Sequence, residues 1–294
     1  MDLAFSDFVD FSNYDRLVPL VQNSLYAGAL LGLLGGLVGV FVIARDLPFA
    51  VHGVSEMSFA GAAAALLLGG SVVAGSFAGS VVAAALIAAL GARARERNSV
   101  IGVLMPFGLG LGILFLALHE GRSANKFGLL TGQIVAVDSA RLNLMIVTTL
   151  AVVAVLAVIW RPLMFASVDP EVAAARGVPV GLLHWVFMIL LGCTVAVAVQ
   201  AVGALLVLAL LCTPTAAAIR LTTSPVLLPL LSALFALTAM LGGTFLALGT
   251  AIPISPYVTT LSFLIYLVAR VVGRPDRRRE VAPSGGGAVG IGAA

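Results

Sequence analysis

The sequence predicts an all-α fold, a polytopic bundle of about eight or nine transmembrane helices without a soluble domain. Hydrophobic residues make up 61% of its 294 residues, and charged residues only 10%. Soluble domains are about 45–50% apolar and about 25% charged, so this composition excludes a soluble globular protein. It also excludes intrinsic disorder, which requires low hydrophobicity and high charge. Apolar runs of roughly 20 residues, the length that spans a bilayer, recur along nearly the whole chain.

Nine stretches have the length and hydropathy of membrane spans, and eight or ten spans are also compatible with the pattern. In chain order they lie at 17–44, 50–70, 72–92, 100–119, 141–160, 181–199, 201–219, 226–248 and 254–272. Residues 121–140 are too polar to span cleanly, although 127–137 can enter the membrane as a short helix. The transmembrane domain therefore covers residues 17–272. It follows a short N-terminal segment at 1–16 and precedes a flexible, Gly- and Ala-rich tail at 273–294.

The placement of basic residues predicts the orientation in the membrane. With the N-terminus outside, 12 of the 16 basic residues fall on the cytoplasmic side and four fall outside. The opposite orientation reverses this count. Because loops rich in Arg and Lys stay in the cytoplasm, we expect an extracytoplasmic N-terminal segment and a cytoplasmic tail.

Glu56 is the one acidic residue that lies well within a predicted span. A carboxylate at the centre of a bilayer helix costs roughly 2.5–3.5 kcal/mol on insertion scales, so it needs a partner or a watery cavity. His52 stands four residues earlier on the same helical face, and Ser55 lies on a neighbouring part of that surface. An imidazole nitrogen and a carboxylate oxygen directed at one point suit Zn²⁺ or Mn²⁺. We therefore predict a metal site at His52 and Glu56; the alternative is an internal His–Glu hydrogen bond that merely neutralises the acid.

The other two histidines are weaker candidates. His119 and its neighbour Glu120 sit at an outer span end, where an exposed or gate position is as plausible as a ligand. His184, beside Trp185, lies near the cytoplasmic end of a span and is interpreted as an interfacial anchor. No His and carboxylate cluster has the spacing of a hydrolase motif, so the sequence predicts no catalytic residue.

The cytoplasmic segment between the fifth and sixth spans encodes a short helix near 169–177. Asp169 suits the N-cap, Pro170 the first helical position, and Gly177 the left-handed cap at the C-terminal end. An ATP-driven motor would dock on this side of the membrane. The chain has no P-loop of its own, because its only lysine, Lys126, follows Asn125. ATP hydrolysis, if it drives transport, must therefore come from a separate subunit, and the chain itself is not an enzyme.

Four stretches of the chain resemble the permease subunits of the ABC-3 family of metal-ion ABC transporters, and together they run through most of the chain in the family's order. These stretches are GGLVGVFVIARDLPFAVHGVSEMSFAG at 35–61, IGVLMPFGLGLGIL at 101–114, DPEVAAARGVPV at 169–180 and QAVGALLVLALLCTPTAAA at 200–218. The last stretch, with its VGALLV run and Thr-Pro before small residues, is the most specific.

The resemblance implies a bacterial plasma-membrane permease that works as a homodimer surrounded by lipid. Its partners would be a cytoplasmic ATP-binding subunit and an extracytoplasmic metal-binding protein, with no nucleic acid and no permanently bound cofactor. The transported ion would be divalent: zinc or manganese, with iron as a further candidate. The family's coupling helix matches the loop helix, whose predicted contact residues are Asp169, Pro170, Glu171, Ala174, Arg176 and Gly177.

The family's metal path includes an Asp and a His four residues later, which match His52 and Glu56 in this chain. The spacing is kept while the imidazole and the carboxylate exchange places, so the family's metal preference does not carry over. We therefore expect the permease of an ATP-driven importer of divalent metal ions. The alternative is an ion- or proton-coupled secondary carrier in which His52 and Glu56 relay protons.

Overall fold

The computed structural model describes residues 21–91, 94–119, 137–248 and 253–273, and the regular elements in these ranges are all helices. In chain order they are α2 (Gln22–Ala44), α3 (Pro48–Leu67), α4 (Val72–Leu90), α5 (Ala94–Leu118), α7 (Ser139–Val168), α8 (Pro170–Ala175), α9 (Val180–Val202), α10 (Ala204–Leu221), α11 (Leu227–Leu248) and α12 (Ile254–Val272). The all-α prediction is confirmed. The N-terminal segment at 1–16, the stretch at 127–136 and the tail from residue 274 lie outside the described residues.

Within the described ranges, eight helices are long and apolar enough to cross a membrane: α2, α3, α4, α5, α7, α9, α11 and α12. The ninth predicted stretch forms α10, which has 18 residues and contains Pro214. Its apolar part, Leu206–Leu221, is shorter than the eight spans. The structure therefore supports the predicted membrane bundle of about eight or nine spans.

The helix of the fifth predicted span continues beyond residue 160, where that span was expected to end. Helix α7 has 30 residues and continues through Pro162 to Val168. The Arg-Pro pair resembles a helix stop, but proline is tolerated in membrane helices where neighbouring groups replace the lost hydrogen bond. Packing favours continuation, because Leu163 is fully buried and Trp160 makes an edge-to-face contact with Phe41, with ring centroids 4.7 Å apart.

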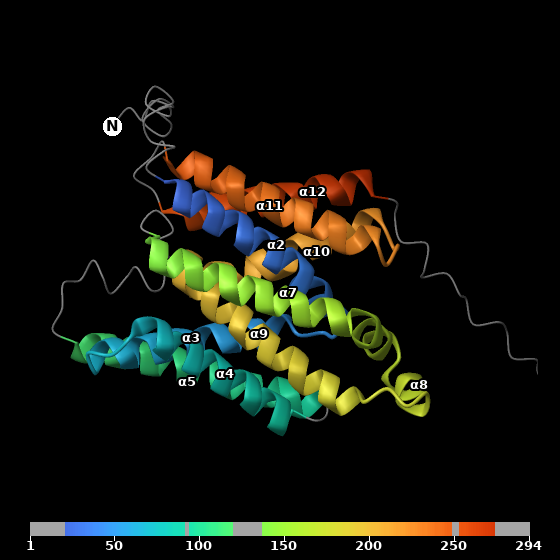
Figure 1. Cartoon of the computed structure of the whole chain (residues 1–294), viewed down its shortest axis with the longest axis horizontal. Helices are drawn as coiled ribbons and strands as arrows, with labels where there is room; N and C mark the ends of the chain where they lie inside the picture. Colours follow the sequence, from blue (N-terminus) through green and yellow to red (C-terminus); the bar gives the residue numbers. More distant parts are fainter. Residues whose placement is uncertain (1–20, 92–93, 120–136, 249–252, 274–294) are drawn as a thin grey trace, which may run out of the picture.

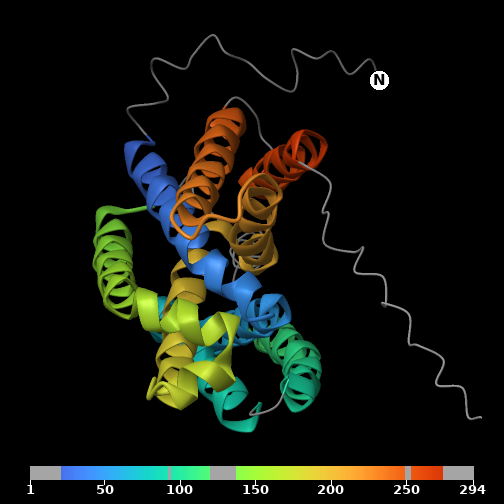
Figure 2. The same cartoon turned by 90° about the vertical axis from the view of Figure 1, so that its right-hand side faces the viewer.

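Two groups of helices lie on either side of α2. On one side α3 packs against α4 and α5, and on the other α10, α11 and α12 pack against one another. Helix α2 contacts α10 and α11 in one group and α3 in the other, so it joins the two groups, and α7 and α9 also pack against it (Figures 1 and 2). Large apolar side chains remain exposed on outward-facing helices, as at Val103, Phe107, Val158 and Val271. Such exposed apolar surface is what a helix needs where it faces lipid.

Glycines bring the backbone of α3 into direct contact with α4. A Cβ atom at Gly61 would collide with the carbonyl oxygen of Gly75, and one at Gly79 would collide with that of Met57. Small residues of this kind let membrane helices approach closely where packing, rather than the hydrophobic effect, holds helices together. The helix that carries His52 and Glu56 is therefore held firmly along one side.

Candidate functional site

A tight turn places the start of α3 directly after α2. The N–H of Leu47 donates to the carbonyl oxygen of Val42 at 2.8 Å, and Asp46 adopts a left-handed backbone conformation with φ of 54°. Pro48 then occupies the first turn of α3, where its missing N–H would have no helical partner. Glu56 follows near the middle of this 20-residue helix.

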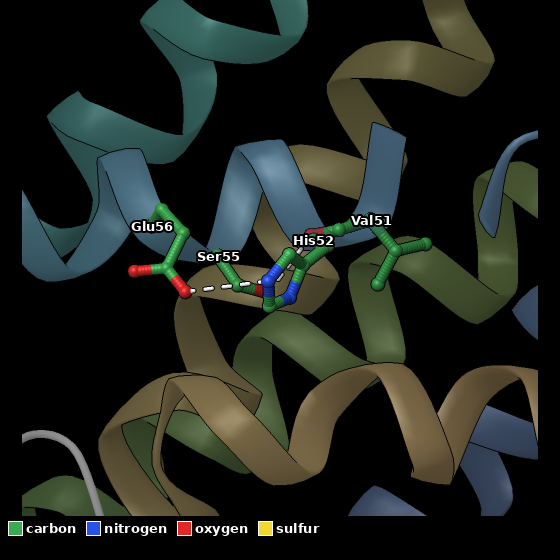
Figure 3. Close-up of polar contacts among 4 residues, drawn as sticks. All are labelled: Val51, His52, Ser55 and Glu56. Atoms are coloured by element: carbon green, nitrogen blue, oxygen red, sulfur yellow. Dashed lines mark hydrogen bonds and ion pairs between the residues drawn. The ribbon is translucent and has the colours of Figure 1, made fainter. Parts of the chain in front are cut away.

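His52 and Glu56 come together on one face of α3, as their spacing predicts (Figure 3). The Nε2 atom of His52 lies 3.6 Å from Oε1 of Glu56, and the two side chains are 27% and 3% exposed. The hydroxyl of Ser55 donates to the carbonyl oxygen of Val51 at 2.9 Å, so it is already engaged by its own helix.

The pair does not satisfy its own hydrogen-bonding groups. A separation of 3.6 Å exceeds the usual range of about 2.7–3.2 Å for a hydrogen bond between nitrogen and oxygen. Oε2 of Glu56 and Nδ1 of His52 are buried and have no hydrogen-bond partner among the described residues. The distance is longer than that of a simple neutralising hydrogen bond, and Oε2 of Glu56 keeps the capacity to accept a hydrogen bond or to bind a cation.

The described part of one copy does not contain a complete set of metal ligands. In the described ranges, no group of three or more His, Cys, Asp or Glu side chains could hold a metal ion together. A Zn²⁺ or Mn²⁺ ion takes four or more ligands. A complete ligand shell around His52 and Glu56 thus needs donors beyond this pair.

Helix α5 fixes the main chain behind Glu56. A Cβ atom at Gly108 would lie 3.0 Å from both the carbonyl carbon of Glu56 and the amide nitrogen of Met57. A Cβ atom at Gly53 would lie in ordinary contact with the Met105 side chain at 3.5 Å. The backbone of the pair is thus packed against α5, and it cannot shift toward that helix.

The two weaker histidine candidates do not join this pair. His119 is half-buried just after the end of α5, and Glu120 lies outside the described residues. His184 lies in the first turns of α9, where its Nδ1 atom is 3.4 Å from Nη2 of Arg45. Sequence reasoning interpreted His184 as an isolated anchor and missed its arginine partner. The available signal was that both residues fall at cytoplasmic ends of predicted spans.

The predicted loop helix is present as α8, at the end of α7 (Figure 1). Oδ1 of Asp169 accepts a hydrogen bond from the N–H of Val172 at 3.0 Å, which is the predicted N-cap. At the other end, Gly177 has φ of 82°. The N–H of Gly177 donates to the carbonyl of Ala174, and that of Val178 donates to the carbonyl of Ala173. These two bonds form a Schellman motif.

One face of α8 packs against the bundle, and its other residues are exposed. Ala173 is fully buried. The predicted contact residues are all exposed: Asp169, Pro170, Glu171, Ala174, Arg176 and Gly177. A short, doubly capped helix with this exposure is suited to contact with another subunit.

Comparison with known proteins decides the family of this chain. The sequence model of the ABC 3 transport family matches residues 18–273, which is most of the chain. The chain belongs to the ABC 3 transport family. Its resemblance through four sequence stretches is therefore confirmed over nearly all of the transmembrane domain.

Relatives within the ABC 3 transport family include manganese transport proteins. The chain is 29% identical over 235 residues to the manganese transport system membrane protein MntC of Halalkalibacterium halodurans, covering 79% of this chain and 80% of the relative. It is 29% identical over 268 residues to the manganese import system permease protein ScaB of Streptococcus pneumoniae, covering 90% and 94%. Among solved structures, it is similar to a chain of PsaBC from Streptococcus pneumoniae in complex with Fab. The TM-score is 0.79, the identity 25%, and the coverage 89% of this chain and 94% of that chain.

The ABC 3 family assignment makes the chain a multi-pass permease subunit of a bacterial membrane transporter. ATP hydrolysis in such a transporter belongs to a separate subunit, which agrees with a sequence that carries no P-loop. A substrate-binding partner also belongs to an importer of this family. Assignment to an ATP-driven family removes the support for the secondary carrier.

Proposed function

We propose that the chain is the permease of an importer of divalent metal ions and that manganese is its first candidate cargo. The relatives named for manganese transport support this cargo. The transporter would be a homodimer of this chain within the lipid bilayer. Each copy would bind one cytoplasmic ATP-binding subunit, and an extracytoplasmic metal-binding protein would deliver the ion.

The buried, incompletely paired carboxylate of Glu56 carries this proposal. It lies near the middle of a membrane helix with only 3% of its side chain exposed, and His52 is its one close titratable neighbour among the described residues. An intramembrane acid of this kind is a mark of an ion pathway. Imidazole nitrogen and carboxylate oxygen together are ligands that Mn²⁺, Zn²⁺ and Fe²⁺ all accept.

Two copies of the chain would complete the ligand shell that one copy lacks. A His52 and Glu56 pair from each copy supplies two nitrogen and two oxygen donors to an ion between them. The side chain of His52 keeps 27% of its surface exposed, so the pair is open on one side. The exchange of imidazole and carboxylate relative to the family pattern leaves the same set of donor atoms.

Helix α8 would pass the motion of the ATP-binding subunit to the metal path. Asp169 is at once the last cap of α7 and the first cap of α8, so the two helices share a junction of one residue. On the other side, Val178 and Pro179 lead directly into α9. Helices α7 and α9 both contact α2, and α9 also contacts α3. A movement of α8 therefore reaches the helix that carries His52 and Glu56 through direct packing.

Metal uptake by the reconstituted complex tests this function. We expect Glu56→Gln to reduce ⁵⁴Mn uptake into proteoliposomes to background while the complex still assembles. Asp138→Asn is the control for charge loss, because it removes an exposed acid at the start of α7 and asparagine also caps a helix; it should keep wild-type uptake. Wild-type uptake by Glu56→Gln would contradict the site. Uptake of an unrelated substrate by the complex, with no response to Mn²⁺, Zn²⁺ or Fe²⁺, would contradict the function.

A further inference from the structure

A basic cavity lies beside α8, apart from the proposed metal path. It has a volume of about 600 Å³ and is lined by parts of α2, α4, α5, α7, α8 and α9 and by the turn between α2 and α3. Its basic side chains are Arg45, Arg97 and His184, and Ser167 and Trp185 add to its polar and aromatic lining. The lining residues from α7, α8 and α9 come from the end of α7, the start of α8 and the start of α9, and Figure 1 shows α8 projecting at this end of the bundle.

Two of the three basic side chains contact each other, and Arg97 is close enough to influence Arg45 electrostatically. Nη2 of Arg45 lies 3.4 Å from Nδ1 of His184. Because a guanidinium can only donate, Nδ1 accepts and the ring proton resides on Nε2. Nη2 of Arg97 donates to the backbone carbonyl of Asp46 at 3.3 Å. Asp46 is the one acidic residue among those that line the cavity, and it is exposed.

The cluster holds more hydrogen-bond donors than acceptors. Nη1 of Arg45, Nε of Arg97 and Nε2 of His184 are buried and have no partner among the described residues. Burial, followed by the nearby charge of Arg97, lowers the pKa of the Arg45 guanidinium. Buried donors without acceptors are rare in native proteins, and two neighbouring cations repel each other. An anion that accepts several hydrogen bonds would relieve both conditions after small rotations of the arginine side chains.

We propose that this cavity binds the phosphate group of an anionic phospholipid. Guanidinium groups match phosphate oxygens in geometry and charge. Basic pockets between membrane helices at the cytoplasmic side are suited to such head groups. The aromatic surroundings agree with the depth of the lipid head groups: Trp185 is 41% exposed, and the guanidinium of Arg45 lies 5.7 Å from the ring centroid of Phe187. A soluble phosphate ion shares this chemistry, and the inference does not depend on which metal is transported.

Native mass spectrometry of the detergent-purified transporter tests this site. We expect wild-type protein to retain phosphatidylglycerol in preference to phosphatidylcholine. The double variant Arg45→Gln/Arg97→Gln should bind phosphatidylglycerol about tenfold more weakly, since each substitution removes a charge-assisted hydrogen bond. Arg220→Gln is the matched control, because it removes a charge in the last turn of α10 without touching the cavity lining. It should retain the lipid.

A second measurement separates the two sources of phosphate. Inorganic phosphate is added to delipidated protein while the melting temperature is followed. Stabilisation of wild type and Arg220→Gln, absent in the double Gln variant, would support a phosphate site filled from solution. If the double Gln variant fails to fold, Arg45→Lys/Arg97→Lys should fold and bind in both assays.

Two results would overturn the proposal. The first is equal lipid and phosphate binding by the double Gln variant and Arg220→Gln. The second is unchanged lipid and phosphate binding together with loss of the ATP-binding subunit in the double variant, which would assign the cluster to an acidic group of that subunit.

Discussion

The molecule contains two buried polar sites whose unsatisfied groups are opposite in kind. At His52 and Glu56, a carboxylate oxygen and an imidazole nitrogen lack partners. At Arg45, Arg97 and His184, the unpaired atoms are donors on two guanidinium groups and one imidazole. Unpaired acceptors favour a cation, and unpaired donors favour an anion. The kind of group left without a partner thus distinguishes the proposed metal path from the proposed phosphate site in the same bundle.

The largest effect is expected from exchanging His52 and Glu56, the pair with the unpaired carboxylate oxygen. His52→Asp and Glu56→His, made singly, should each lower metal uptake by about 10–100-fold, because each disturbs the donor set. The double variant restores one carboxylate and one imidazole at the same spacing and should regain most of the uptake. Uptake is measured with ⁵⁴Mn in proteoliposomes, and phosphatidylglycerol retention should be the same in all three variants. A double variant as inactive as the single ones would mean that the order of the donors matters.

We expect an effect of intermediate size on stability and uptake when the close packing of α3 against α4 is disturbed. Gly61→Ala places a methyl group against the carbonyl oxygen of Gly75, so the helices must separate at a cost of about 1–3 kcal/mol. We expect a lower melting temperature in detergent and reduced uptake.

Gly110→Ala is the matched control for this substitution, because a Cβ atom at Gly110 has open space around it. The control should be neutral or slightly stabilising, since Ala favours a helix by about 1 kcal/mol over Gly. Equal melting temperatures for the two variants would show that close contact of α3 with α4 does not hold the metal site in place. Both variants should retain phosphatidylglycerol, because neither glycine lines the basic cavity.

The smallest effect is expected from removing the N-cap of α8, the helix that contributes Pro170 to the lining of the basic cavity. Asp169→Ala removes the N-cap, so the α8 amides should exchange hydrogen about fivefold faster for a loss of about 1 kcal/mol. Stimulation of ATP hydrolysis by metal-loaded binding protein should weaken. Asp138→Ala removes the equivalent cap at the other end of α7, where Oδ1 accepts from the N–H of Arg141 at 2.7 Å. If both variants lose stimulation equally, α8 has no special role in coupling.

Features that depend only on residues close together in the chain could be predicted from the sequence. The spans follow from apolar runs, and the His52 and Glu56 pair follows from a spacing of four residues. The caps of α8 follow from Asp169, Pro170 and Gly177 because a cap depends only on neighbouring backbone groups. The structure adds what spacing cannot supply, namely that one carboxylate oxygen of the pair has no partner among the described residues.

Features that depend on how distant helices meet could not be predicted. Arg45 and His184 are separated by 139 positions in the chain, and no local pattern connects them. The end of α7 was missed for a similar reason, because packing of Trp160 and Leu163 against the core outweighs the local helix-breaking preference of Pro162. Glycine spacing likewise does not reveal which glycines meet a neighbour, since Gly108 lies against Glu56 and Gly110 lies in open space.

The junction at Asp169 has a mechanical consequence. Helix α7 has 30 residues, which corresponds to about 45 Å at a rise of about 1.5 Å per residue. Because Asp169 alone joins it to α8, α7 would act as the long arm of a lever, with α8 as the short arm, if α8 couples to an ATP-binding subunit as proposed. A tilt of about 5° at the junction would displace the far end by about 4 Å. An ångström-scale push from an ATP-binding subunit would thus arrive, enlarged, at the opposite face of the membrane.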